Sequence, residues 1–356
     1  MTARCAAIQS DNTSSCDRRG PRKRALCVGC DYPFSEAPLR GACNDALLAA
    51  HVLRSLLGFP ADDICVLVDK QDGPTGHAPP YTEISRLPTR AVMLKALRWL
   101  VSGAEPDDVL FFSFSGYGCQ IDDLDGYEGE GFSSAILPAD YMCENECGDM
   151  RVIPTEDIRS VLLSVPPGVK VFLLMDCDHT TDIVDATGCT SAIHDERCWV
   201  EGGSAQMEAR PRHRIPSVVE VDLAALRRGP ENRESVGFMR RPTSTAFCLS
   251  ASDHAQTALE MLLPTDPQLP FSPIGVISGQ ISLQRSIHGV VTWSWWRALQ
   301  ELLQRRGHHP TVSQVHEHVN EIIAMVRRDR HPRCDQVCVL TAALPQSNPS
   351  ETRYCA

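Results

Sequence analysis

The chain has 356 residues, of which 43% are hydrophobic and 22% are charged, a composition typical of soluble globular proteins. The formal net charge of −11 and the lack of a basic stripe interleaved with aromatic residues argue against a nucleic-acid partner, and no apolar stretch reaches the roughly 18–20 residues of a membrane span. The 16 cysteines, in a chain without a hydrophobic signal core at its start, indicate a reduced protein, which we expect in the cytoplasm.

Apolar runs of strand length alternate with helical patterns in the first half of the chain. After a polar tail over 1–23, we predict strand 24–30, a helix capped by Asn44 or Asp45, strand 63–68, a helix capped by Thr89, strand 109–114, helix 155–163 and strand 169–175. Strands that alternate with helices indicate crossover connections. The pattern therefore predicts an α/β fold, a mostly parallel sheet with helices on both faces.

The second half of the chain is less regular. Residues 186–243 are charged and contain glycine and proline, and we interpret them as an exposed insertion between two halves of one domain. Beyond it we predict a strand end over 247–253, helices over 288–299 and 311–326, strand 337–340, and a C-terminal tail over 346–356.

Two of the predicted strands end abruptly in small and polar residues. One segment is 109–118, Val-Leu-Phe-Phe-Ser-Phe-Ser-Gly-Tyr-Gly, and the other is 169–181, which contains Met-Asp-Cys-Asp-His at 175–179. In a parallel sheet the carboxyl ends of the strands line the ligand crevice. We therefore expect the functional site at these two ends.

Together with Leu-Arg-Gly-Ala-Cys-Asn-Asp at 39–45, the two segments resemble the metacaspases, cysteine peptidases related to the caspases. The resemblance extends over about residues 24–345, as a large-subunit-like part at 24–185 and a small-subunit-like part at 244–345. It implies a three-layer caspase-like fold and, as for most members, a monomer.

Both reactive groups of that family are replaced here. The resemblance places Tyr117 at the position of the catalytic His and Asp178 at that of the nucleophilic Cys. A tyrosine, with an ordinary pKa of about 10, is a poor base near neutrality, and a carboxylate is a weak nucleophile toward an amide. Since loss of both groups removes the mechanism, we expect a pseudopeptidase with a regulatory or binding role. Its expected partner is an active metacaspase relative or a basic peptide segment.

The resemblance also implies an acidic pocket for Arg or Lys, formed by Asp45, Ser115 and Asp176. Paired carboxylates suit a guanidinium, which donates in a planar fork. Asp45 has an equally supported alternative, which is to cap its own helix.

Many metacaspases bind calcium, and the resemblance places two ligands at Asp185 and Glu156. Calcium prefers six to eight oxygens with several carboxylates, so we expect a weakened site or none.

Two other functions stay open. The first is a residual Arg/Lys-specific cysteine endopeptidase that uses Cys177, with His179 or another base, although strand alternation directs Cys177 away from its two neighbours. The second is a metal-binding or metal-dependent protein built on four carboxylates: Asp176, Asp178, Asp182 and Asp185.

Overall fold

The centre of the molecule is a six-stranded sheet in the order β13-β10-β7-β3-β1-β2. The computed structural model describes residues 20–69, 87–122, 132–143, 151–180, 183–184, 209–211, 218–219, 244–251, 257–265, 285–306, 308–330, 336–343 and 348–356. The six strands are β1 (Lys23–Gly29), β2 (Ile64–Val68), β3 (Val109–Ser115), β7 (Lys170–Asp176), β10 (Thr245–Ser250) and β13 (Val339–Ala343). All neighbours are parallel except β13, which runs antiparallel to β10.

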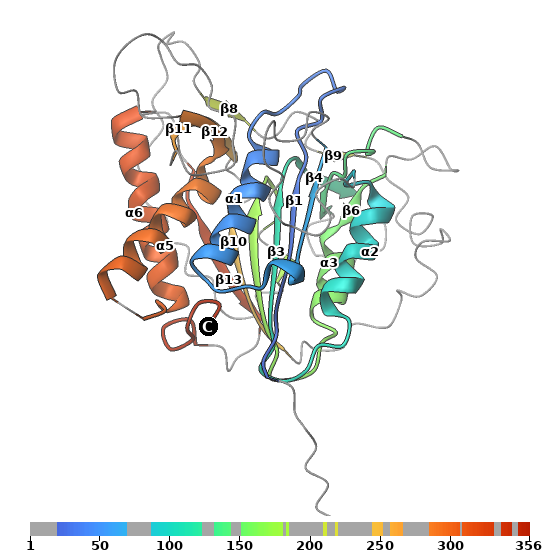
Figure 1. Ribbon diagram of the computed structural model, residues 1–356. Coiled ribbons are helices and arrows are strands. Elements are labelled where there is room, and N and C mark those ends of the chain that lie inside the picture. The colour runs from blue at the N-terminus through green and yellow to red at the C-terminus, as the bar shows by residue number, and fades with distance from the viewer. Residues whose placement is uncertain are drawn as a thin grey trace, which may run out of the picture.

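Helices cover both faces of this sheet (Figure 1). On one face lie α1 (Ala42–Ser55), α5 (Val290–Arg306) and α6 (Val312–Arg330), and on the other lie α2 (Arg90–Val101) and α3 (Thr155–Leu162). Consecutive side chains of β3 point to opposite faces of the sheet. Phe111 packs in the core under α1, α5 and α6, and Phe112 packs in the core under α2 and α3. The expected three-layer α/β fold is confirmed.

Two small sheets were not predicted. The first has the order β12-β11-β8, with β12 (Arg285–Gly289), β11 (Leu259–Pro264) and β8 (Ala209–Pro211). The second has the order β6-β5-β4-β9, with β6 (Ile153–Pro154), β5 (Phe132–Ile136), β4 (Gly118–Asp122) and β9 (Val218–Val219). Both lie toward the upper end of the molecule in Figure 1. Strands β8 and β9 belong to the predicted insertion, and the rest of 186–243 lies outside the described residues.

The starts of two helices differ from the prediction. Strand β12 includes His288, so α5 begins at Val290 and not at 288. Helix α1 begins at Ala42, so neither Asn44 nor Asp45 is its cap, and that prediction is wrong. The predicted cap of α2 is confirmed, because Thr89 Oγ1 accepts a hydrogen bond from the Val92 amide.

Asp31 supplies the cap of α1 from the loop after β1. Its Oδ1 accepts from the amide of Ala42 at 2.8 Å and from the amide of Cys43 at 3.2 Å. These are two of the amides that the helix itself leaves without acceptors. A residue well before the helix in the sequence therefore fixes where it begins.

Residues 348–356, which the sequence suggested to be a tail, pack against the domain. The Tyr354 hydroxyl accepts from Trp295 Nε1 at 3.0 Å, and its ring lies 5.0 Å from that of Phe172. Lys23 Nζ donates to the Cys355 carbonyl at 2.8 Å, which joins this segment to β1. Among the helices in the described ranges, none is long and apolar enough to cross a membrane.

Candidate functional site

The candidate site lies where β1, β3 and β7 end. Their last residues, Gly29, Ser115 and Asp176, are register partners across the three strands. Just beyond, Gly118 lies against the backbone of Asp178, so closely that a Cβ atom on this glycine would overlap the Asp178 carbonyl oxygen. The two strand ends singled out in the sequence are therefore neighbours in space.

Tyr117 is buried and holds the loop between β1 and α1. Its ring stacks on that of Tyr32, with centroids 4.7 Å apart, and its hydroxyl donates to the Ala37 carbonyl. The Tyr117 amide donates to the Tyr32 hydroxyl at 2.9 Å, which in turn donates to the Leu137 carbonyl at 2.6 Å. The Tyr117 O–H is thus engaged with the backbone of the loop between β1 and α1.

Asp178 is also buried, and its carboxylate anchors a second segment. Its Oδ1 accepts from the amide of Ala258, just before β11. The next residue, His179, has a φ of 55°, in the left-handed region that non-glycine residues seldom adopt. The chain therefore turns sharply after β7, and Asp178 ties this turn to the start of the β11–β12 pair.

Cys177 lies in the core on the opposite face of the sheet. Its side chain is fully buried among the residues that α2 and α3 cover, whereas Asp176 reaches α5 on the other face. The Cys177 thiol lies 3.8 Å from Thr180 Oγ1, which hydrogen-bonds to Ser250 Oγ at 2.8 Å. A thiol enclosed in this way does not meet a peptide carbonyl in this conformation.

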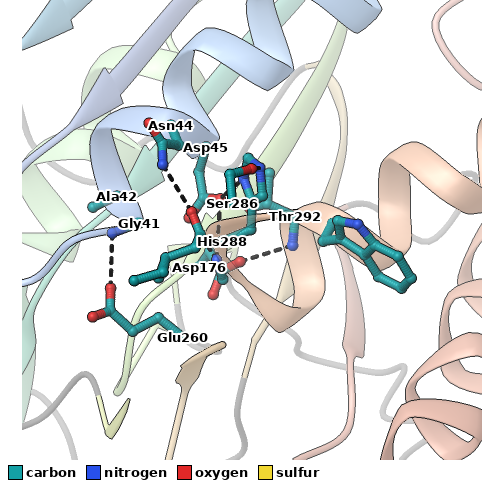
Figure 2. A network of polar contacts seen from close by, with 12 residues as sticks. Gly41, Ala42, Asn44, Asp45, Asp176, Glu260, Ser286, His288 and Thr292 are labelled. Carbon is teal, nitrogen blue, oxygen red and sulfur yellow. Dashed lines mark hydrogen bonds and ion pairs between the residues drawn. The ribbon is translucent and has the colours of Figure 1, made fainter. Parts of the chain in front are cut away.

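Asp45 is fully buried and accepts hydrogen bonds from the end of β12 (Figure 2). His288 Nδ1 lies 3.0 Å from Asp45 Oδ1, and the Gly289 amide donates to both carboxylate oxygens at 3.1 and 3.0 Å. Since a carboxylate only accepts, His288 Nδ1 carries the hydrogen. On the other side of the ring, His288 Nε2 lies 2.6 Å from Ser286 Oγ.

Asp176 caps the helix that follows. Its Oδ2 accepts from the amide of Thr292, the third residue of α5, at 2.7 Å. A negative charge at this end also interacts favourably with the helix dipole. A Cβ atom on Gly289 would overlap the same carboxylate, so Gly289 lies directly against both Asp45 and Asp176.

Sequence reasoning missed His288, Ser286 and Glu260. Glu260 of β11 accepts from the amides of Arg40 and Gly41 and lies opposite Gly289 in the ladder. No local pattern marks Glu260 and His288, because each contacts a segment more than 200 positions away, and Ser286 joins the site through its contact with His288.

Ser286, His288 and Asp45 have the hydrogen-bond order of a serine-hydrolase triad. The first two side chains are 1% and 0% exposed, so a substrate carbonyl does not reach Ser286 Oγ in this conformation. We interpret the three as a structural network that joins β12 to α1.

Two further carboxylates fix the loop beside the site. Asp69 accepts from the amides of Asp31 and Tyr32, both at 2.7 Å. Burial, together with the Asp69 charge, raises the pKa of Asp31 to about 6. Burial also raises the pKa of Asp69. These groups support the loop that Tyr117 holds from the other side.

The described residues do not bring the predicted metal ligands together in one place. Asp182 and Asp185 lie outside the described residues, and Glu156 lies in the first turn of α3. Within the described part of the chain, no three His, Cys, Asp or Glu side chains form a group that could hold a metal ion. The expectation of a weakened calcium site or none therefore stays a prediction.

Comparison with known proteins agrees with the motifs. Residues 23–187 match the model described as the metacaspase, peptidase C14 domain. Residues 23–187 are therefore similar to a metacaspase-type peptidase domain. The match includes Asp45, Tyr117 and Asp178, so all three segments that carried the resemblance fall inside it.

Two yeast relatives show the same likeness. Metacaspase-1 of Kluyveromyces lactis is 33% identical over 192 residues, and metacaspase-1 of Saccharomyces cerevisiae is 32% identical over 196. Each alignment covers 53% of this chain and 41% of the relative, so the chain spans about two fifths of the length of these curated relatives. The solved structure of protein GSU0716 from Geobacter sulfurreducens has a TM-score of 0.54 over 94% of this chain and 99% of its own. At 16% identity, this last likeness concerns the fold alone.

Proposed function

We propose that this chain is a metacaspase-type pseudopeptidase, which binds or regulates and does not cleave. The observation that supports the proposal is that Tyr117 and Asp178, which the resemblance equates with the two catalytic residues, make structural hydrogen bonds. Peptide hydrolysis by cysteine peptidases needs a thiolate and a base within reach of each other. A tyrosine bonded to a loop carbonyl and a carboxylate bonded to an amide provide neither.

The proposed role is to bind an active metacaspase relative or a basic peptide segment. Asp45 and Asp176 support this choice. Asp176 ends β7, at the sheet edge where α/β proteins bind their ligands, and Asp45 in the first turn of α1 contacts the same Gly289 as Asp176 does. The net charge of −11 also favours a basic partner over an acidic one. We further propose that the chain acts as a monomer, as the resemblance implies.

The rival proposal, a residual peptidase that uses Cys177, is tested by covalent labelling. We expect a peptidyl electrophile that ends in arginine to leave Cys177 unmodified, since its thiol is buried in the core. Intact-mass and peptide-mapping spectrometry on the native full chain give the measurement.

Exposed Cys143 is the internal control and should react with a simple alkylating agent such as iodoacetamide. An adduct at Cys177 that forms with the arginyl electrophile, fails with a glutamyl analogue, and disappears in Cys177→Ser would replace the pseudopeptidase proposal with the cysteine-peptidase one.

A further inference from the structure

The acidic site is filled from within the molecule. Among the donors to its two carboxylates are three from the end of β12 and the start of α5: the His288 ring and the Gly289 amide bind Asp45, and the Thr292 amide binds Asp176. Both carboxylates are fully buried, and Figure 2 shows the ring, the helix start and the two acids converging at one place. Buried charges persist only where such partners compensate for the lost hydration.

Of these three donors, only the one from His288 is a side chain. The Gly289 and Thr292 amides belong to the backbone at the start of α5, and they leave only if that end unwinds. The His288 ring is fixed by Asp45 on one side and Ser286 on the other, and a rotation about its side-chain bonds breaks both contacts. The ring is therefore the component of the site that another group can replace.

We propose that His288 is a built-in occupant of the acidic site, and that it closes Asp45 to side-chain cations from a partner. The inference rests on the proposed function only in treating Asp45 and Asp176 as the binding site. A guanidinium is a stronger partner for the carboxylate than the ring, since it donates through two parallel N–H groups. A basic segment thus binds after the ring has left, and His288 determines whether it does.

The test is a His288→Ala variant of the full chain with methylguanidinium as the probe. N-methylurea is the matched control ligand, because it has nearly the same shape and no charge. We expect methylguanidinium to bind the variant about tenfold or more tightly than the natural chain, and to raise the thermal midpoint of the variant by about 2 °C at tenfold excess over Kd. N-methylurea should have no such effect on either protein.

Two further variants make the result specific. His288→Gln keeps a donor and most of the volume, so it should stay closed to the cation. Adding Asp45→Asn to His288→Ala should abolish cation binding. If His288→Ala alone is unfolded, methylguanidinium and not N-methylurea should restore its fold, as followed by circular dichroism.

Equal effects of the cation and the urea on His288→Ala would overturn the proposal. Equal cation binding by the natural chain and the variant would also overturn it, because the ring would then not be the barrier. None of these measurements depends on peptide cleavage. A negative binding result would therefore not contradict the proposed lack of peptidase activity. Conversely, peptidase activity in the chain would leave a positive binding result intact.

Discussion

Replacement of Asp45 by alanine is expected to lower the free energy of unfolding by about 3–5 kcal/mol, because it leaves buried donors without their acceptor. The His288 ring N–H and the Gly289 amide both lose the carboxylate, and of the side-chain bonds between β12 and α1 the one from Asn44 to the Ile287 carbonyl remains. Urea denaturation of the full chain, followed by circular dichroism, measures the change.

Asp62→Ala is the matched control, since Asp62 is an exposed aspartate on the short helix before β2. Its replacement should change stability by no more than about 0.5 kcal/mol. If the two variants unfold at the same urea concentration, the network around His288 does not support the fold as described.

Gly118→Ala is expected to destabilise the protein by about 3 kcal/mol, at the upper end of the cost of overpacking. A Cβ atom there would overlap backbone atoms of Asp178, and backbone at a sharp turn cannot yield as a flexible side chain does. The thermal midpoint from differential scanning calorimetry gives the measurement.

Gly20→Ala is the comparison for this substitution, because nothing lies within 4 Å of its added Cβ. We expect its midpoint to equal that of the natural chain. A Gly118→Ala protein with an unchanged midpoint would mean that the two strand ends lie farther apart than the structure places them.

The sequence predicted the central layers well because their signal is local. Strand β3 is an unbroken apolar run, and a strand buried on both faces requires that composition. Its end at Ser115 is equally visible, since Gly116 and Gly118 interrupt the run. The close approach of Gly118 to Asp178 then follows from the parallel pairing of β3 with β7.

The missed features depend on contacts between distant segments. Strand β12 reads Arg-Ser-Ile-His-Gly, a mostly polar sequence that becomes a strand by pairing with β11. The cap of α1 was assigned to residues near the helix, whereas Asp31 provides it across a loop. The His288 ring lies on Asp45 because α1 packs against β12. Hydrophobic periodicity in the sequence does not reveal such packing between distant segments.

The two residues that the resemblance equates with the catalytic pair share a physical property. Tyr117 fills its place with a stacked ring and a bond to the loop before α1, and Asp178 joins the end of β7 to the segment before β11. Each of these side chains stabilises a neighbouring segment, and under the proposed function each stands in place of a reactive group. The proposed pseudopeptidase therefore retains a well-packed site without a nucleophile or a base.

Peptide cleavage by the native full chain tests this central claim most directly. Peptides with Arg or Lys at the scissile position should be incubated with and without added calcium, beside Asp178→Asn, which keeps an acceptor for the Ala258 amide and lacks the ionised carboxylate. We predict that neither the natural chain nor this variant cleaves faster than a buffer blank under either condition. Cleavage after Arg or Lys by the natural chain that is lost in Asp178→Asn would contradict it.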